Sequence, residues 1–244
     1  MSNIYERTDL LIGEEGRKKL QNAKVAVIGV GGVGSYAAEA LARSGVGHIV
    51  LMDKDEVDET NLNRQLQTSF DNIGKSKVLE MKKRIESYAN CEVTCVEDFF
   101  TTEHRWVLEG CDYVVDAIDT MSAKFDLIEL CHEMGIPCIS SLGMANRLDP
   151  SQVYVTTLDK TYNDRMAKAC RQIARKRGIK YKVKVVASKE TAVIQNQEIH
   201  EEGTRKQRIP PGSMVLVPAM AGLMCAYSVI KDLVYNEPCQ IRME

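Results

Sequence analysis

A glycine-rich loop near the amino end constrains the fold of this chain more than any other stretch. In "VIGVGGVG", Gly29, Gly31 and Gly34 follow an apolar run at GxGxxG spacing. Asp53 closes a second apolar run about twenty residues later, where an acid can bind a ribose hydroxyl. The glycines let the backbone approach a phosphate, so the loop predicts a nucleotide-binding α/β domain, with either NAD or ATP as the ligand.

Strands and helices are predicted to alternate through the first 141 residues. Runs rich in β-branched residues alternate with stretches of helical periodicity. This order is typical of a Rossmann-like, doubly wound, mainly parallel sheet with helices on both faces. The predicted strands cover 24–30, 48–53, 92–97, 112–117 and 137–141, and the predicted helices cover 32–44, 75–89 and 121–134.

The pattern changes after Pro150. We therefore predict an ATP-binding core over 1–150 and a C-terminal α+β extension over 151–244, within one compact domain. The extension is predicted to hold a strand at 152–157, a helix at 163–177 and an alternating strand at 179–187. The segment 198–211 is polar and contains glycine and proline, which is typical of a mobile loop.

Composition and cysteine usage indicate a cytoplasmic protein. The polar amino end shows no signal peptide, and the eight cysteines of the 244 residues form no CxxC pair, so no zinc is expected. Segment 209–230 is uncharged and long enough to cross a bilayer. Prolines interrupt its first half, so we expect a buried or interface helix rather than a membrane span.

Polar residues after the predicted strands favour ATP over NAD. An arginine, a lysine and several acids at the carboxyl ends of parallel strands suit a triphosphate with magnesium, whereas hydride transfer needs no such set. Taken singly, Arg64 or Lys77 is more often a solvated surface charge, but the combination of residues at these places favours a binding site. The residues are Asp55, Asn61, Arg64, Gln65, Lys77, Asp116 and Asp119.

Four stretches resemble the adenylation motifs of the ubiquitin-activating-enzyme superfamily: "GVGGVG", "DKDEVDETNLNRQ", "GKSKV" and "DAIDT". The resemblance covers residues 5–145. It implies that ATP and Mg²⁺ serve to adenylate a carboxylate, with release of pyrophosphate.

The resemblance also implies individual roles. Gly31 and Gly32 would approach the phosphates, Asp53 would bind the ribose, and Asp119 would serve the magnesium–phosphate cluster. The residues that would contact the triphosphate are Asn61, Arg64 and Lys77. The predicted nucleotide site also includes Gly29, Gly34, Asp55 and Gln65. Arg7, in "YERTDLLIG", matches an arginine that reaches into the partner subunit's site, which implies a homodimer.

The group that captures the adenylate separates the subfamilies. Sulfur-carrier activators usually hold two zinc-binding CxxC pairs and a reactive cysteine, and this chain lacks the pairs. Cys170 lies between Lys168 and Arg171, which favours a thiolate. However, it shares an apolar helix face with Met166 and Ile173, so we expect a packed cysteine. The substrate itself would then consume the adenylate.

The extension carries a basic segment that suggests an RNA partner. Residues 165–189 hold ten lysines and arginines and no acid. A solvated face is the ordinary reading of a charge run, but such faces usually mix signs, so a polyanion is at least as good a reading. The predicted nucleic-acid contacts are Arg171, Arg175, Lys180, Lys182 and Lys184, the lysines forming one solvent-facing side of the strand at 179–187.

The carboxyl-terminal half resembles the tRNA threonylcarbamoyladenosine dehydratase family. The likeness rests on "SLGMANRLDPSQVYVTTLDKTYNDRMAKACRQ", on "ASKE" after the basic strand and on "PPGSMVLVPAMAGLMCA". The segment "VVASKE" departs from the family in lacking a following proline. The resemblance implies that ATP activates the threonyl carboxylate of a modified adenosine next to the tRNA anticodon, and that the substrate's carbamoyl nitrogen closes a ring with loss of water.

Other functions stay open at this point. A sulfur-carrier or ubiquitin-like-protein adenylyltransferase shares the same ATP motifs. An NAD-dependent oxidoreductase fits the glycine loop alone, and a nucleotide-sensing module would not need Asp55 and Asp119. The sequence also leaves open a structural Na⁺ or K⁺ and a sulfur-relay protein as a partner.

Overall fold

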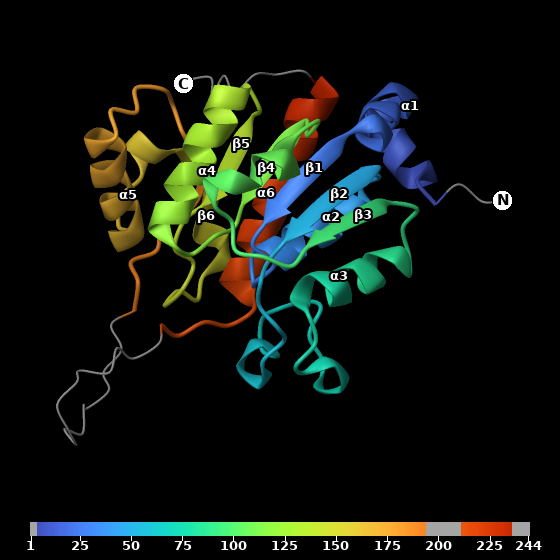
Figure 1. The fold of residues 1–244 in the computed structure, drawn as a ribbon, viewed down its shortest axis with the longest axis horizontal. Coiled ribbons are helices and arrows are strands. Elements are labelled where there is room, and N and C mark those ends of the chain that lie inside the picture. Colours follow the sequence, from blue (N-terminus) through green and yellow to red (C-terminus); the bar gives the residue numbers. More distant parts are fainter. Residues whose placement is uncertain (1–3, 194–210, 236–244) are drawn as a thin grey trace.

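A seven-stranded sheet runs through the molecule (Figure 1). The computed structural model describes residues 4–193 and 211–235. The strand order is β3-β2-β1-β4-β5-β7-β6, and neighbours pair in parallel except for β6, which is antiparallel to β7. The strands are β1 (Lys24–Ile28), β2 (His48–Met52), β3 (Glu92–Val96), β4 (Tyr113–Asp116), β5 (Cys138–Ser141), β6 (Val153–Thr157) and β7 (Lys184–Ser188).

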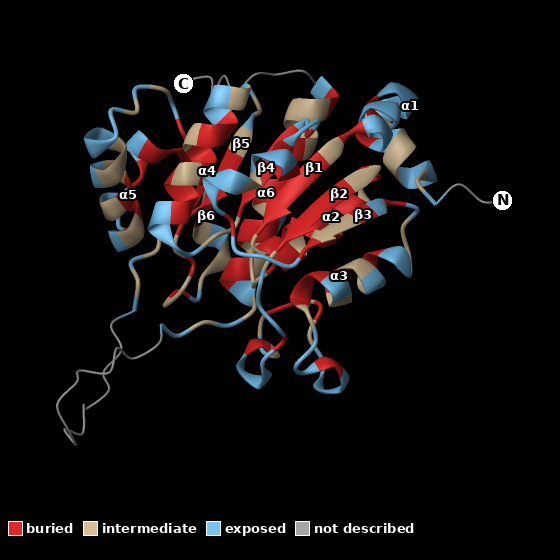
Figure 2. Cartoon of the chain, viewed as in Figure 1, coloured by how far each residue is buried: buried red, intermediate tan, exposed pale blue. Residues whose placement is uncertain are grey.

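Helices cover both faces of this sheet, which confirms the predicted fold class. Along β1, Val25 and Val27 pack in one apolar cluster, and Ala26 and Ile28 pack in another on the opposite face. Figure 2 shows buried strands between helices whose outer sides are exposed. The helices are α1 (Glu6–Asn22), α2 (Gly34–Arg43), α3 (Lys77–Glu86), α4 (Met121–Met134), α5 (Arg165–Lys176) and α6 (Leu216–Tyr235).

Two elements differ from the sequence predictions. Helix α1 was not predicted, and its backbone leaves helical geometry at Gly13, where φ is 74°. The strand predicted at 179–187 is wrong at its start, because β7 begins only at Lys184. Its pairing explains this, since Lys184 is the first residue that lies opposite both Ile139 of β5 and Thr157 of β6. The predicted loop 198–211 lies almost entirely outside the described residues.

Helix α6 belongs to the core. A Cβ on Gly222 would lie 2.4 Å from the carbonyl oxygen of Val33 and 2.8 Å from the Cβ of Tyr36, so only glycine lets α6 pack this closely on the first turns of α2. In the described part of the chain, α6 is the helix long and apolar enough to cross a membrane, and half of its most apolar window is buried inside the fold. That burial is typical of a core helix, as the sequence predicted.

The chain order creates a place for a ligand. After β1 the chain adds β2 and β3 on one side, and β4 then pairs with the other edge of β1. The loops that follow β1 and β4 therefore diverge at the carboxyl ends of these strands. Open α/β sheets bind their ligands at this point.

Candidate functional site

A cavity of about 740 Å³ opens at the carboxyl ends of β1, β2, β4 and β5. This volume lies within the range of small-molecule and cofactor sites. Most of the predicted nucleotide-site residues line it. These are Gly29, Gly31, Gly32, Asp53, Asp55, Asn61, Arg64, Gln65, Lys77 and Asp119.

The glycine loop forms the floor between β1 and α2. Gly29 adopts φ of 91°, and a Cβ there would lie 2.7 Å from the carbonyl oxygen of Ala117. A Cβ on Gly34 would lie 1.8 Å from the carbonyl oxygen of Gly29. Gly34 does not line the cavity, so its place is in the packing of α2 rather than against a ligand. The N-terminus of α2 lies beside this loop, and its free backbone N–H groups and helix dipole favour binding of an anion.

Asp53 and Lys77 are fixed by hydrogen bonds around the cavity. The Asp53 carboxylate accepts the backbone N–H of Val30 at 2.7 Å and that of Asp55 at 2.9 Å, which ties the ends of β1 and β2 together. Lys77 begins α3 and is buried, and its Nζ donates to Asp55 Oδ2 at 2.9 Å. A buried ammonium beside a helix N-terminus suits a phosphate.

The short 3-10 helix Glu59–Asn61 and the turn after it supply three more polar side chains. Arg64 Nη1 donates to the carbonyl oxygen of Thr60 at 2.6 Å, which anchors its guanidinium at the edge of the cavity. Asn61 is buried and accepts the Asp58 N–H at 3.2 Å. Gln65 Oε1 is buried without a hydrogen-bond partner among the described residues, so a ligand donor would satisfy it.

Asp116 and Asp119 have separate surroundings, although both come from "DAIDT". Asp119 is exposed and lines the cavity. Asp116 is fully buried, where it pairs with Lys124 at 2.8 Å and accepts from Ser140 at 2.6 Å. Asp116 was grouped with the polar residues of the predicted site, but its partners hold it inside the fold, and of the two acids only Asp119 lines the cavity. Among the described residues, no group of three or more His, Cys, Asp or Glu is placed to hold a metal ion.

The wall opposite the glycine loop was not predicted from the sequence. It is formed by Gly143, Met144 and Ala145 after β5 and by Met166 at the start of α5. Behind it, the buried Arg147 donates to the carbonyl oxygens of Gly143 and Glu190, and lies 3.5 Å from Asp164, the N-cap of α5. These residues lie in the stretches that carry the second resemblance, but no local pattern indicated that they meet, because they come together only in the folded chain.

Arg7 lies outside the cavity of its own chain. It is exposed near the start of α1 and is not among the residues that line the cavity. Helix α1 lies at the end of the molecule that bears the amino ends of the strands (Figure 1). An action of Arg7 on a nucleotide site would therefore require a second subunit.

Cys170 is packed rather than reactive, as predicted. It is buried in the apolar cluster between α4, α5 and β7. This burial raises the pKa of its thiol to about 11, so the thiolate is scarce at neutral pH.

The predicted basic surface needs correction at two residues. Lys184 is not solvent-facing, since its Nζ binds Asp232 on α6 at 2.6 Å. Arg171 is partly buried and donates to the carbonyl oxygen of Thr161 at 2.8 Å. The other three predicted contacts, Arg175, Lys180 and Lys182, are exposed, and Arg165, Lys168 and Lys176 are exposed beside them on α5. The cationic surface therefore lies on α5 and the turn after it.

Known proteins share this fold and its motifs. The model of the ThiF family matches residues 5–242. The tRNA threonylcarbamoyladenosine dehydratase of Bacillus subtilis is 44% identical over 242 residues, which are 96% of this chain and 95% of that one.

A solved structure agrees with this match. The E. coli tRNA N6-threonylcarbamoyladenosine dehydratase in complex with ATP is 34% identical, with a TM-score of 0.85 over 95% of this chain and 94% of that one. By contrast, the adenylyltransferase and sulfurtransferase MOCS3 of Drosophila sechellia is 33% identical over only 59% of this chain and 32% of its own length. The family model spans nearly the whole chain, and the chain belongs to the ThiF family.

Proposed function

We propose that this protein is an ATP-dependent dehydratase that cyclises threonylcarbamoyladenosine in tRNA. The support comes from the cavity, whose lining combines the glycine loop, Arg64, Lys77 and Asp119 with residues 143–145 after β5. It comes also from the near full-length similarity to dehydratases of that name.

The reaction needs two steps. The threonyl carboxylate attacks the α-phosphorus of ATP, and pyrophosphate leaves to give an acyl adenylate. The carbamoyl nitrogen of the same substrate then attacks the activated carbonyl carbon, AMP leaves with the carboxylate oxygen, and the nitrogen loses its proton. One observation favours the second step: no described cysteine lines the cavity, and Cys170 is packed away. The nucleophile that captures the adenylate is therefore best supplied by the substrate.

Lys77 and Arg64 would stabilise the phosphoryl charge that develops in the first step. Asp55 accepts a hydrogen bond from the Lys77 ammonium and orients it at the cavity. With the triphosphate of ATP beside Lys77 and Arg64, the part of the cavity lined by residues 143–145 is left for the modified nucleoside of the tRNA.

Asp119 fits a magnesium site. Mg²⁺ in nucleotide sites is commonly held by one or two carboxylates together with phosphate oxygens and waters, and the exposed Asp119 offers such a carboxylate at the cavity edge. The ion would neutralise phosphate charge during adenylation.

A homodimer and a tRNA surface complete the proposal. Exposed leucines on α1 and α6, with Leu10 86% and Leu11 81% exposed, suit burial against a second copy. A second copy would also let Arg7 act on a nucleotide site. The cationic surface on α5 begins beside the cavity, where Met166 lies, and suits the phosphates of tRNA. We propose a cytoplasmic location, which fits a tRNA substrate.

Mass spectrometry of the modified nucleoside tests the proposal. After incubation of the protein with ATP, magnesium and tRNA that carries threonylcarbamoyladenosine, the nucleoside should lose the mass of one water. Reactions without ATP serve as the control. Unchanged mass, together with adenylation of a small protein that ends in Gly-Gly, would instead support a sulfur-carrier adenylyltransferase.

A further inference from the structure

A second cavity, of about 590 Å³, lies at the amino ends of the strands, whereas the nucleotide site lies at their carboxyl ends. It opens between the amino ends of β4, β5 and β7 and the last turns of α4 and α6. None of its lining residues has a part in the proposed chemistry at the carboxyl ends of the strands.

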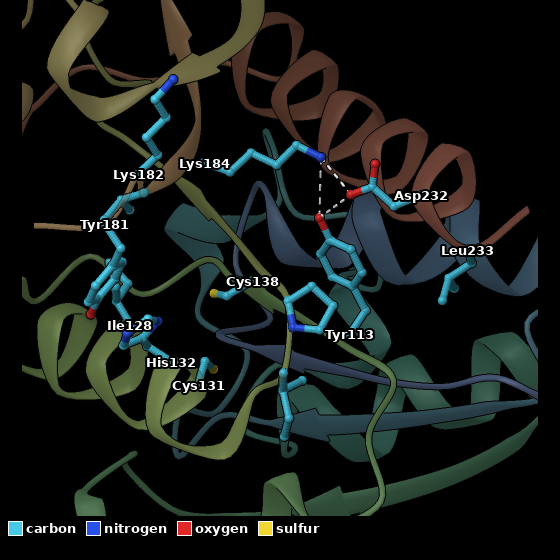
Figure 3. Close-up of a pocket in the computed structure, with 13 residues that line it drawn as sticks. Tyr113, Ile128, Cys131, His132, Cys138, Tyr181, Lys182, Lys184, Asp232 and Leu233 are labelled. Carbon is cyan, nitrogen blue, oxygen red and sulfur yellow. Dashed lines mark hydrogen bonds and ion pairs between the residues drawn. The ribbon is translucent and has the colours of Figure 1, made fainter. Parts of the chain in front are cut away.

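The two ends of this cavity differ in chemistry (Figure 3). At one end the rings of His132 and Tyr181 stack with centroids 3.6 Å apart and an interplanar angle of 16°. At the other end, Asp232 Oδ2 accepts hydrogen bonds from Tyr113 Oη at 2.8 Å and from Lys184 Nζ at 2.6 Å. The remaining lining is mainly aliphatic. A flat heteroaromatic group with a polar edge matches this combination.

The polar end retains hydrogen-bonding capacity. Both bonds to Asp232 fall on Oδ2, and no bond from a described residue reaches Oδ1. Lys184 Nζ also approaches Tyr113 Oη at 3.5 Å, so the three groups form one partly buried network. A carboxylate oxygen at this place can accept an amino group on the edge of a base.

A cationic path connects the two cavities. Met166 in the first turn of helix α5 lines the nucleotide cavity, and the helix ends five residues before Tyr181. Figure 1 shows α5 running along one side of the sheet. Its 12 residues span about 18 Å. The exposed cations Arg165, Lys168, Arg175, Lys176, Lys180 and Lys182 follow this path, and Lys182 lines the second cavity itself.

We propose that this second cavity binds one base of the tRNA strand, stacked on the Tyr181–His132 pair, while the phosphates before it follow α5. The proposal rests on the proposed tRNA substrate and adds a second point of contact to it. Stacking on an aromatic side chain is strong and tolerant of sequence, whereas the cations alone would hold the backbone without holding a base.

Replacement of Tyr181 tests the stacking contact. Tyr181→Leu keeps an apolar side chain but removes the aromatic face, and should weaken tRNA binding by about fivefold or more. Tyr181→Phe should bind as the unaltered protein does, because the buried Tyr181 hydroxyl makes no hydrogen bond to a described residue. Binding is measured by fluorescence anisotropy with labelled tRNA, and thermal unfolding checks that each variant folds.

Two controls separate this contact from general effects. Phe70→Ala removes an aromatic ring that is 78% exposed and lines neither cavity, so tRNA binding should not change. Lys182→Glu should reduce the slope of log affinity against log salt by about 0.7–0.9, as loss of one phosphate contact does, whereas Lys83→Glu on α3 should not.

Photocrosslinking of tRNA that contains iodouridine should link a base to a peptide with Tyr181 or His132. Equal tRNA binding by Tyr181→Leu and the unaltered protein would overturn the base site and leave the proposed function standing. Absence of tRNA binding by the unaltered protein would instead overturn the proposed function. Binding of free AMP that depends on Tyr181, with tRNA binding unaffected, would contradict the assignment to an RNA strand.

Discussion

At the scale of single residues, Arg64 and Asp119 meet at one cavity from different loops and carry opposite charges. Each would stabilise a different part of the charge on the triphosphate during adenylation. We expect Arg64→Ala and Asp119→Ala each to lower the rate of ATP–pyrophosphate exchange by about 100- to 1000-fold, the usual cost of removing one group that stabilises a transition state. Exchange is measured with labelled pyrophosphate and the tRNA substrate.

Arg105→Ala is a suitable control for these variants. Arg105 is half exposed, and its ion pair with Glu133 is 3.8 Å long, so its removal should leave exchange unchanged. Near-normal exchange in both Arg64→Ala and Asp119→Ala would contradict the assignment of the site.

Cys170 gives a second prediction at this scale. Because burial raises the pKa of its thiol to about 11, it should not act as a nucleophile at neutral pH. We expect Cys170→Ala to retain adenylation and ring closure, with a loss of about 1 kcal/mol or less in the free energy of unfolding from the small cavity. A variant that forms the adenylate but no longer completes the reaction would show that Cys170 captures the acyl group.

At the scale of elements, Glu39 joins α2 to α3. Its carboxylate accepts hydrogen bonds from Arg84 at 2.9 Å, from Tyr88 at 2.8 Å and from Arg43 at 2.7 Å. Burial raises the pKa of Glu39, but the hydrogen bonds from these partners outweigh burial and hold the pKa below its usual value. The contact therefore joins two helices that follow the glycine loop and begin with Lys77, respectively.

We expect Glu39→Gln to lower the free energy of unfolding by about 1.5–3 kcal/mol at pH 7, as for hydrogen bonds to a charged group. Because the pKa of Glu39 is lower in the folded state than in the unfolded state, its ionised carboxylate stabilises the folded protein at pH values above the unfolded-state pKa. This contribution to the free energy of unfolding is lost as the pH falls through the folded-state pKa. The difference between the variant and the unaltered protein should therefore be constant near neutrality and shrink in acid.

Urea unfolding at several pH values measures this difference. Glu86→Gln on α3 is the control, because its pair with Lys82 is exposed and should contribute about 0.5 kcal/mol or less. A constant difference down to pH 3 would contradict the role of the Glu39 charge.

At the scale of the whole molecule, the position of Arg7 separates it from the cavity of its own chain. If Arg7 acts in the partner's site, neither Arg7→Ala nor Asp119→Ala alone should be active. Equal mixtures should recover about a quarter of the full activity, since one site in each mixed dimer has both residues. Exchange activity of mixtures is measured after subunit exchange.

Mass spectrometry of the intact assembly shows whether the mixed dimers form. Mixed dimers without recovered activity would contradict an action of Arg7 across the interface. A protein that stays monomeric would contradict the homodimer itself.

The sequence by itself determined the parallel core and most of the nucleotide site. Strands buried on both faces read as apolar runs, and α4 has the bounds that periodicity predicts, because both signals are local. The glycine loop was equally visible, since a positive φ at Gly29 and the close contact at Gly34 exclude other residues over a few positions.

Only the tertiary structure decided which charged side chains are available to a ligand. Asp116 and Asp119 are three positions apart, yet Lys124 and Ser140 bury one, whereas the other faces the cavity. Lys184 and Lys182 follow the same alternation, but only Lys184 meets Asp232, which lies on the last helix. The pairing of a charge depends on partners that are distant in the chain, and no local pattern reports them. The sequence therefore predicts where charges gather, and the packing of the elements decides which of them remain available to a ligand.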